Sequence, residues 1–389
     1  MSTFATRHRR MRFRIVCTLL ATAAFGCGKG GPRGWPQTSL GEIDRGPAWN
    51  YPSLTLDPQG RPVVGYSNAP LTFAANQALV KRWNGSAWEA LGGQLNTAGT
   101  EAGSPRLAID SGDVVAAWAE APPSASLQET IRAARWTGSS WTPIGAQVTP
   151  AGTYGNGLRF AAGAQGPVVT YTQWGTSASG TVTRWDGVSW KTYVSTPSMG
   201  ATYLDLALQA DGSPVISWAV QTTSPQYIVK TLRWDVPSLA WIQLPANTYD
   251  STVNTSIVVD ANGGIFLASG PPPAATSDPG LPVLRAAATS WDGVGAPQGG
   301  AGSFAHFVQT TGPLALLNLE PSGYIVSEYL GGTQWQAVAE IPNASPGGSP
   351  CGLTATDTTV FAVCPVWGLD VDANGHQVSH LLAMDFKKP

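Results

Sequence analysis

Residues 82–88 read Arg-Trp-Asn-Gly-Ser-Ala-Trp, and a closely similar tryptophan phrase returns along the chain. It recurs at Arg135 and at Arg184, and a looser copy begins at Arg233. The four copies start 53, 49 and 49 positions apart. A period of that length is typical of one supersecondary unit that is repeated in space. The phrase therefore predicts a repeat protein.

A second recurring element is a hairpin whose turn is rich in Asp, Asn and Gly, flanked by β-branched residues. The second strands of these hairpins are predicted to start at Val63, Val115, Val168, Val215, Ile265, Leu314 and Val360. The tryptophan phrase adds a third strand, which ends at its first Trp, and a fourth, which starts at its second Trp. Seven repeats of four antiparallel strands predict an all-β fold, a seven-bladed β-propeller.

The two ends of the chain complement each other. The last repeat stops in its third strand, at residues 381–386, and lacks a fourth. Residues 35–41, near the N-terminus, parallel the fourth strand of the first repeat at residues 88–92. We expect this N-terminal strand to pair with the last blade and close the propeller, which removes an exposed sheet edge.

The N-terminus reads as an export signal. Basic residues precede an apolar run at residues 15–25, which is too short to span a bilayer. We assign residues 1–26 to a signal peptide of the lipoprotein type, residues 27–33 to a tether and residues 34–389 to the propeller. Cys27 is the candidate lipidation site; cleavage by an ordinary signal peptidase at the same place is the alternative.

The charge of the chain excludes one class of partner. Five of the 22 basic residues lie in the leader, which leaves 17 against 24 acidic residues and a net charge of −7. Nucleic acid requires clustered Lys and Arg, so we expect no nucleic-acid partner. We expect a monomer that is exported to a bacterial cell envelope. There it is either held at a membrane by its lipid alone, or it is periplasmic or extracellular.

Two cysteines remain in the body of the chain. Cys351 and Cys364 flank a predicted hairpin that turns at Asp357 and Thr358. A turn centred there places the two cysteines opposite each other, near enough for a disulfide after a small adjustment. An exported protein meets an oxidising compartment. We therefore predict a structural disulfide.

One set of polar residues falls at a single repeat position, near the start of each first strand. Its members are Ser53, Arg106, Arg159, Asp205 and Ser256. In propellers this end of the first strand lies at the channel mouth, on the face that usually binds ligands. Long connections at residues 119–129, 269–282 and 365–376 are predicted on the same face. The alternative is a salt-bridge network of the Arg106–Asp205 kind that merely fills the channel.

The whole chain after the leader resembles the seven-bladed propellers of the kelch and sialidase-like groups. The phrase Trp185-Asp186-Gly187, followed by Trp190, is similar to the Asp-box turn of sialidase-like blades, with the Asp shifted to follow the first Trp. The resemblance implies fold and repeat. Sialidase-like enzymes hold a carboxylated sugar with three arginines; only two align in this chain, and no Tyr/Glu nucleophile pair can be assigned.

The tryptophan phrases are interpreted as packing between neighbouring sheets, with a sugar-stacking platform as the alternative. No Gly-x-Ser-x-Gly elbow occurs, and no catalytic residue is assigned. Asp370, Asp372 and Asn374 match the opening of a calcium loop, but the closing acid is missing, so we expect an ordinary turn and no metal or other cofactor.

The predicted function is binding of a protein or glycan. The alternative is a sialidase-like or other carbohydrate-active enzyme.

Overall fold

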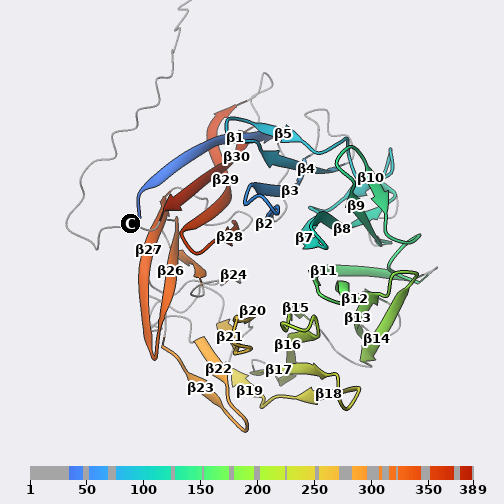
Figure 1. The fold of residues 1–389 in the computed structure, drawn as a ribbon, viewed down its shortest axis with the longest axis vertical. Helices are drawn as coiled ribbons and strands as arrows, with labels where there is room; N and C mark the ends of the chain where they lie inside the picture. Colours follow the sequence, from blue (N-terminus) through green and yellow to red (C-terminus); the bar gives the residue numbers. More distant parts are fainter. Residues whose placement is uncertain are drawn as a thin grey trace, which may run out of the picture. The chain divides into compact units, whose positions relative to one another are not determined.

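A computed structural model of the chain divides into two compact units, Met1–Arg33 and Gly34–Pro389. The structure describes residues 35–46, 52–68, 76–123, 128–150, 153–174, 179–196, 202–223, 226–249, 254–270, 283–295, 306–308, 315–320, 323–342, 351–371 and 377–387. All of these residues belong to the second unit, and Figure 1 shows their strands, with labels where there is room.

The strands of the described residues form seven antiparallel sheets. The first sheet contains β2 (Ser53–Leu56), β3 (Pro62–Asn68), β4 (Gln77–Trp83) and β5 (Trp88–Ala90). The second contains β6 (Glu101–Ala102), β7 (Arg106–Asp110), β8 (Asp113–Ala121), β9 (Thr130–Trp136) and β10 (Trp141–Pro143). The third contains β11 (Tyr154–Gly163), β12 (Gly166–Trp174), β13 (Ser179–Trp185) and β14 (Trp190–Thr196).

The remaining sheets continue this order. The fourth contains β15 (Thr202–Leu208), β16 (Pro214–Thr223), β17 (Gln226–Asp235), β18 (Ala240–Gln243) and β19 (Asn247–Tyr249). The fifth contains β20 (Asn254–Val259), β21 (Ile265–Gly270), β22 (Val283–Ala286) and β23 (Trp291–Gly293). The sixth contains β24 (His306–Val308), β25 (Ala315–Glu320), β26 (Gly323–Gly331) and β27 (Gln334–Pro342). The seventh contains β28 (Gly352–Ala355), β29 (Thr359–Val371), β30 (Gln377–Lys387) and β1 (Gln37–Gly46).

The tryptophan phrase marks the hairpin between third and fourth strands, as predicted. In the first sheet, Trp83 ends β4 and pairs with Trp88, which begins β5. The side-chain Oδ1 of Asn84 accepts the backbone N–H groups of Ser86 and Ala87, at 3.0 and 2.9 Å. A side chain that captures N–H groups in this way fixes a tight turn, which explains why Asn or Asp follows the first Trp.

Apolar side chains fill the spaces between consecutive sheets. Val168 and Val182 of the third sheet, for example, share a buried cluster with Leu204 and Ile216 of the fourth. The first strands of consecutive sheets also contact one another: β2 with β7, β7 with β11, β11 with β15, β15 with β20, β20 with β24, β24 with β28, and β28 with β2. Every sheet thus has its sequence neighbours as neighbours in space.

The second Trp of the phrase joins one sheet to the preceding one through an indole hydrogen bond. Trp141 donates its indole N–H to the backbone oxygen of Leu91 at 2.6 Å, and Trp190 donates to Ile144 at 2.8 Å. The same bond runs from Trp88 to Leu40, from Trp291 to Pro245 and from Trp335 to Val294. These bonds confirm packing as a role of the phrase.

A glycine with a positive φ follows the accepting residue at four of these five contacts: Gly41, Gly92, Gly145 and Gly295. Gly92 and Gly145 have φ of 77° and 73°, in the left-handed region that favours glycine. A Cβ atom at Gly145 would lie 2.9 Å from Cζ3 of Trp185, so the indole rings also need the empty space. Glycine thus serves both conformation and room at these contacts, whereas at the fifth contact Ala246 follows the accepting Pro245.

The N-terminal strand β1 pairs antiparallel with β30, from Gln37 opposite Phe386 to Gly46 opposite Ser379 (Figure 1). Its Leu40 and Ile43 are buried in a cluster that also contains side chains of β3. His380 of β30 is buried, with Nδ1 3.1 Å from Oε1 of Glu42. β1 thus covers a polar side chain of β30 and provides its carboxylate partner.

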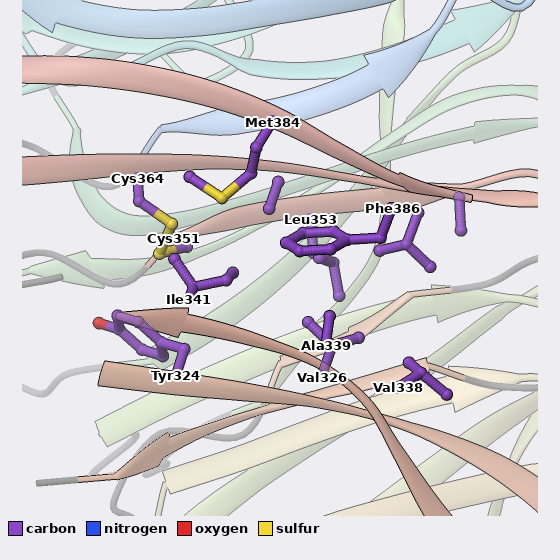
Figure 2. Close-up of a cluster of buried hydrophobic side chains, with 13 residues drawn as sticks. Tyr324, Val326, Val338, Ala339, Ile341, Cys351, Leu353, Cys364, Met384 and Phe386 are labelled. Carbon is purple, nitrogen blue, oxygen red and sulfur yellow. A yellow bond between two sulfur atoms is a disulfide. The ribbon is translucent and has the colours of Figure 1, made fainter. Parts of the chain in front are cut away.

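Cys351 and Cys364 form the predicted disulfide beside the hairpin β28–β29. Figure 2 shows it among buried side chains from β26, β27 and the seventh sheet, including Tyr324, Met384 and Phe386. The neighbouring pairing of Gly352 with Val363 explains the bond, because it leaves the two cysteines opposite each other. One expected loop is wrong: residues 365–371 continue β29 instead of leaving the sheet.

Replacement of both cysteines by alanine is expected to lower the free energy of unfolding by about 3 kcal/mol, because the bond closes a short loop of the unfolded chain. The two cysteines are 13 positions apart. Urea unfolding of the double variant beside the oxidised wild type measures the difference. Equal midpoints would show that the bond does not contribute to stability.

Candidate functional site

The pairing register puts the five candidate residues at equivalent places in their hairpins. Each stands on a first strand opposite a residue of the second strand: Ser53 opposite Gly65, Arg106 opposite Ala117, Arg159 opposite Thr170, Asp205 opposite Ser217 and Ser256 opposite Ala268. We call this place the first-strand position. A part in ligand binding stays a prediction for all five residues.

Asp205 links three sheets at the first-strand position. Arg159 of the third sheet donates from Nε to Oδ1 of Asp205 at 3.1 Å. The other carboxylate oxygen, Oδ2, accepts the backbone N–H of Ile257 in the fifth sheet at 2.8 Å. Asp205 is buried, and a buried carboxylate needs such partners because desolvation of an isolated charge is costly. The ion pair joins Asp205 to Arg159, where the sequence had suggested Arg106.

Ser53 makes the corresponding contact between the first and second sheets. Its hydroxyl donates to the backbone oxygen of Pro105 at 2.6 Å. The space is tight, because a Cβ atom at Gly65 would lie 2.6 Å from the same oxygen. Residues at the first-strand position therefore form hydrogen bonds between neighbouring sheets at more than one place. This agrees with the alternative in which these residues form a polar network that fills the channel.

Arg159 retains capacity for a ligand. Its Nη1 donates to the backbone oxygen of Leu158 at 3.2 Å, and its side chain is 34% exposed. Among the described residues, no contact engages Nη2. A guanidinium whose Nε is fixed by a carboxylate offers its remaining donors in a set direction, which suits a carboxylate or another anion.

Substitution of Asp205 by alanine is expected to lower the free energy of unfolding by about 2 kcal/mol, because it leaves the N–H of Ile257 without an acceptor and Arg159 without its counter-charge. Asp205→Asn keeps an acceptor for Ile257 and is expected to lose less. Urea unfolding of both variants tests this order. An alanine variant as stable as the asparagine variant would contradict it.

The first-strand position is occupied by two further residues, which the alignment of the repeats in the sequence did not include. His306 pairs with Leu317 in the sixth sheet, and Gly352 pairs with Val363 in the seventh. They follow Ser256 at intervals of 50 and 46 residues, within the spacing of the other repeats. Repeat length alone was the signal that could have found them.

A second polar cluster surrounds Glu120 at the end of β8. Its carboxylate accepts Nε of Arg132 at 2.6 Å and the indole N–H of Trp118 at 2.9 Å. It also accepts the backbone N–H and the hydroxyl of Thr97, at 3.1 and 3.0 Å. Four donors satisfy this buried carboxylate, so its role is to fasten the connection between β5 and β6 to the second sheet.

Glu129, just before β9, is in a different state. Burial raises the pKa of its carboxyl group, which favours the protonated form. A raised pKa is the direction that suits a carboxyl group to donate a proton. Glu129 adjoins Thr130, which pairs with Glu120.

Other candidates lie wholly or partly outside the described residues. Cys27 and the leader are among them, as are Asp372 and Asn374 of the calcium-loop candidate; Asp370 lies in β29. Within the part of the chain that the structure describes, no cluster of three His, Cys, Asp or Glu residues suits a metal ion. Nor does that part contain a helix long and apolar enough to cross a membrane.

Comparison of the sequence with protein-family models and with curated proteins gave no match. Solved structures do resemble the chain. The polysaccharide lyase Uly1 has a TM-score of 0.53 at 10% identity, covering 85% of this chain and 89% of its own. The β-propeller domain of the Trilobed protease from Pyrococcus furiosus has a TM-score of 0.52 at 11% identity, covering 87% and 98%. The endosialidase of phage phi92 has a TM-score of 0.51 at 10% identity, covering 91% and 70%. Identities this low show the fold alone, which is that of β-propeller proteins.

Proposed function

We propose that this chain is an exported seven-bladed β-propeller that binds an anionic protein or glycan at its channel mouth without transforming it. The contacts between consecutive first strands, from β2 through β28 and back to β2, support seven blades in a ring. The pairing of β1 with β30 supports closure by the N-terminal strand, which completes the last blade.

The placement of the protein follows from its N-terminus and its disulfide. Residues 1–26 act as the signal peptide, residues 27–33 are the tether, and Cys27 carries the lipid. A disulfide is consistent with an oxidising compartment outside the cytoplasm. We propose that the lipid is the protein's only attachment to the membrane and that residues 34–389, as a monomer, face the periplasm or the exterior.

The observation that carries the binding function is the guanidinium of Arg159, fixed by Asp205 and one-third exposed. Arg106 occupies the same register on β7, and β7 contacts β11. Two arginines on adjacent first strands suit a ligand with a carboxylate, because bidentate Arg–carboxylate pairs are both strong and directional. Ser53 and Ser256 would supply hydroxyl groups at the same level.

The test is a glycan array probed with residues 28–389, followed by titration of the best acidic ligand. We expect binding that falls at least about tenfold in Arg159→Ala, the size of effect typical of a charge-assisted contact. Arg82→Ala is the matched control, since Arg82 pairs with Glu89 in a hairpin of the first sheet. Array binding to neutral glycans alone, or equal binding by both variants, would refute an anion site at Arg159.

The second candidate is a carbohydrate-active enzyme, and one observation favours it. Burial raises the pKa of Glu129, which is the direction that suits a proton donor. Two of the similar structures are a polysaccharide lyase and an endosialidase, so such folds carry these activities. A panel of chromogenic glycosides and acidic polysaccharides tests it. Turnover that Glu129→Gln abolishes would replace the binding proposal with catalysis.

A further inference from the structure

The seam between the third and fourth sheets differs from five of the others at its outer edge. At five seams, the second Trp of the phrase donates its indole N–H to a backbone oxygen of the preceding sheet. Trp241 is the corresponding residue of the fourth sheet, and its Nε1 is buried with no hydrogen-bond partner. The preceding strand, β14, has Tyr193 and Val194 where β5 and the segment after it have Leu91 and Gly92. No carbonyl of β14 bonds to Trp241.

Aromatic rings take the place of that hydrogen bond. Tyr193 of β14 meets Trp234 of β17 edge-on, with ring centroids 5.0 Å apart, and Trp234 packs against Trp241 at 5.5 Å. The guanidinium of Arg184 lies 4.7 Å from the ring centre of Tyr193. The seam is thus held by ring contacts, and an indole donor remains unused within it.

Exposed apolar side chains gather at the same two hairpins. The described residues include five large hydrophobic side chains that are exposed, and four of them belong to the hairpins β13–β14 and β17–β18 (Figure 1). They are Val188 (85% exposed), Leu239 (72%), Val236 (41%) and Ile242 (37%). Isolated exposed hydrophobic residues are ordinary, but a group beside one seam indicates an interaction site.

The backbone at Leu239 adds an independent sign. Its φ is 51°, in the left-handed region, whereas the tips of the other phrase hairpins place glycines there, such as Gly85 and Gly187. A branched side chain is strained in this conformation, and an exposed Leu gains no burial in return. Such outliers persist where a function requires the side chain.

We propose that the outer edge of the seam between the third and fourth sheets is a docking surface for an extended apolar segment of another protein. A backbone carbonyl of that segment accepts from Trp241, as a carbonyl of the preceding sheet accepts from the corresponding Trp at five other seams. The segment's side chains cover Val188 and Leu239. Because Nε1 of Trp241 is shielded here, the hairpin β17–β18 shifts when the segment binds. This surface is separate from the channel mouth and does not depend on the anion site.

The charges at the two hairpins favour a polypeptide over a lipid surface. Asp186 and Asp235 stand at the turns, and hydrogen bonds from the backbone N–H of Ser189 and the side chain of Ser238 lower the pKa of these carboxyl groups. Both are therefore ionised at neutral pH. Ionised carboxylates at the tips oppose insertion into a bilayer and are repelled by anionic headgroups.

Two probes test the surface. One is a labelled synthetic peptide of residues 88–95, Trp-Glu-Ala-Leu-Gly-Gly-Gln-Leu, which carries the carbonyl that Trp141 uses in the intact chain. The other is a phage library of random linear peptides. We expect saturable binding of the peptide and selection of apolar segments. Leu239→Gly is expected to weaken binding at least about tenfold, as loss of an anchor side chain does, while it raises the melting temperature by relieving the strained φ.

Matched variants separate docking from structure. Leu330→Ser removes the fifth exposed hydrophobic side chain, on β26 of the sixth sheet, where Trp335 has its carbonyl partner, and is expected to bind both probes normally. Trp241→Phe keeps the ring and loses the donor, and is expected to bind severalfold more weakly. Equal binding by Leu239→Gly and wild type, no saturable binding of either probe, or Leu239-dependent binding to phosphatidylcholine vesicles in place of peptides would each overturn the proposal.

Discussion

A chain that lacks β1 is expected to lose its folded, monomeric state. Removal of Gln37–Gly46 leaves the whole outer edge of β30 without hydrogen-bond partners, and such an edge is prone to pair with other chains. It also exposes the surface that Leu40 and Ile43 cover, at a cost of about 2 kcal/mol for each side chain.

The loss of stability extends to the first sheet, because side chains of that sheet donate hydrogen bonds to acceptors on β1. Trp88 donates to the backbone oxygen of Leu40 at 3.1 Å, and Nζ of Lys81 donates to that of Ile43 at 2.6 Å. The hydroxyl of Tyr66 donates to Asp44 at 2.7 Å, and burial raises the pKa of this phenol, which keeps its proton in place. Each buried donor without an acceptor costs about 1–3 kcal/mol more.

Size-exclusion chromatography and thermal unfolding measure the outcome. The matched control is a chain that begins at Gly34, which keeps β1 and is expected to be a stable monomer. The chain without β1 is expected to aggregate or to unfold at least about 5 °C lower, given a loss above about 5 kcal/mol in a chain of this length. A monomer with an unchanged melting temperature would show that β1 is dispensable.

Substitution of Glu120 by alanine is expected to lower the free energy of unfolding by about 3–5 kcal/mol, as removal of one partner from a buried ion pair does. The substitution leaves the donors of Trp118 and Thr97 without an acceptor, and Arg132 without its counter-charge. The connection between β5 and β6 would come loose from the second sheet.

Two controls make the Glu120 result specific. Glu120→Gln keeps an acceptor for Trp118 and Thr97, so it is expected to lose less than the alanine variant. Glu89→Ala removes an ion pair with Arg82 that is exposed, and such pairs contribute about 0–1 kcal/mol. Denaturant unfolding of the three variants gives the comparison. A Glu120→Ala variant no less stable than Glu89→Ala would contradict the assignment of a fastening role.

The repeat and its hairpins could be predicted because local sequence determines them. Turn residues such as Asn84 and Asp186 accept hydrogen bonds from backbone N–H groups within three positions, so the residue type alone predicts these contacts. The disulfide was predictable for the same reason, since symmetry about one turn places Cys351 opposite Cys364. The parallel between residues 35–41 and 88–92 located the strand that pairs with β30.

Contacts between repeats could not be predicted, because they depend on the angle and offset at which sheets pack. Arg106 and Arg159 are equivalent in sequence, and only the placement of neighbouring sheets decides that Arg159 reaches Asp205. Glu120 receives donors from Thr97, which lies 23 positions away in a connection with no repeat pattern. The unused donor of Trp241 depends on how β14 packs against the fourth sheet, which the recurring phrase does not reveal.

The indole bonds between sheets have a consequence for how the gene can change. Donor and acceptor lie in consecutive repeats, as in the bonds of Trp141 to Leu91 and Trp190 to Ile144. Excision of the second unit, for example, would bring the indole of Trp190 beside the carbonyl of Leu91. Unequal recombination between copies would therefore preserve these bonds when it adds or removes whole units and leaves an accepting carbonyl beside each indole, and would break them when it removes a fraction. Copy number is the kind of variation that this architecture tolerates.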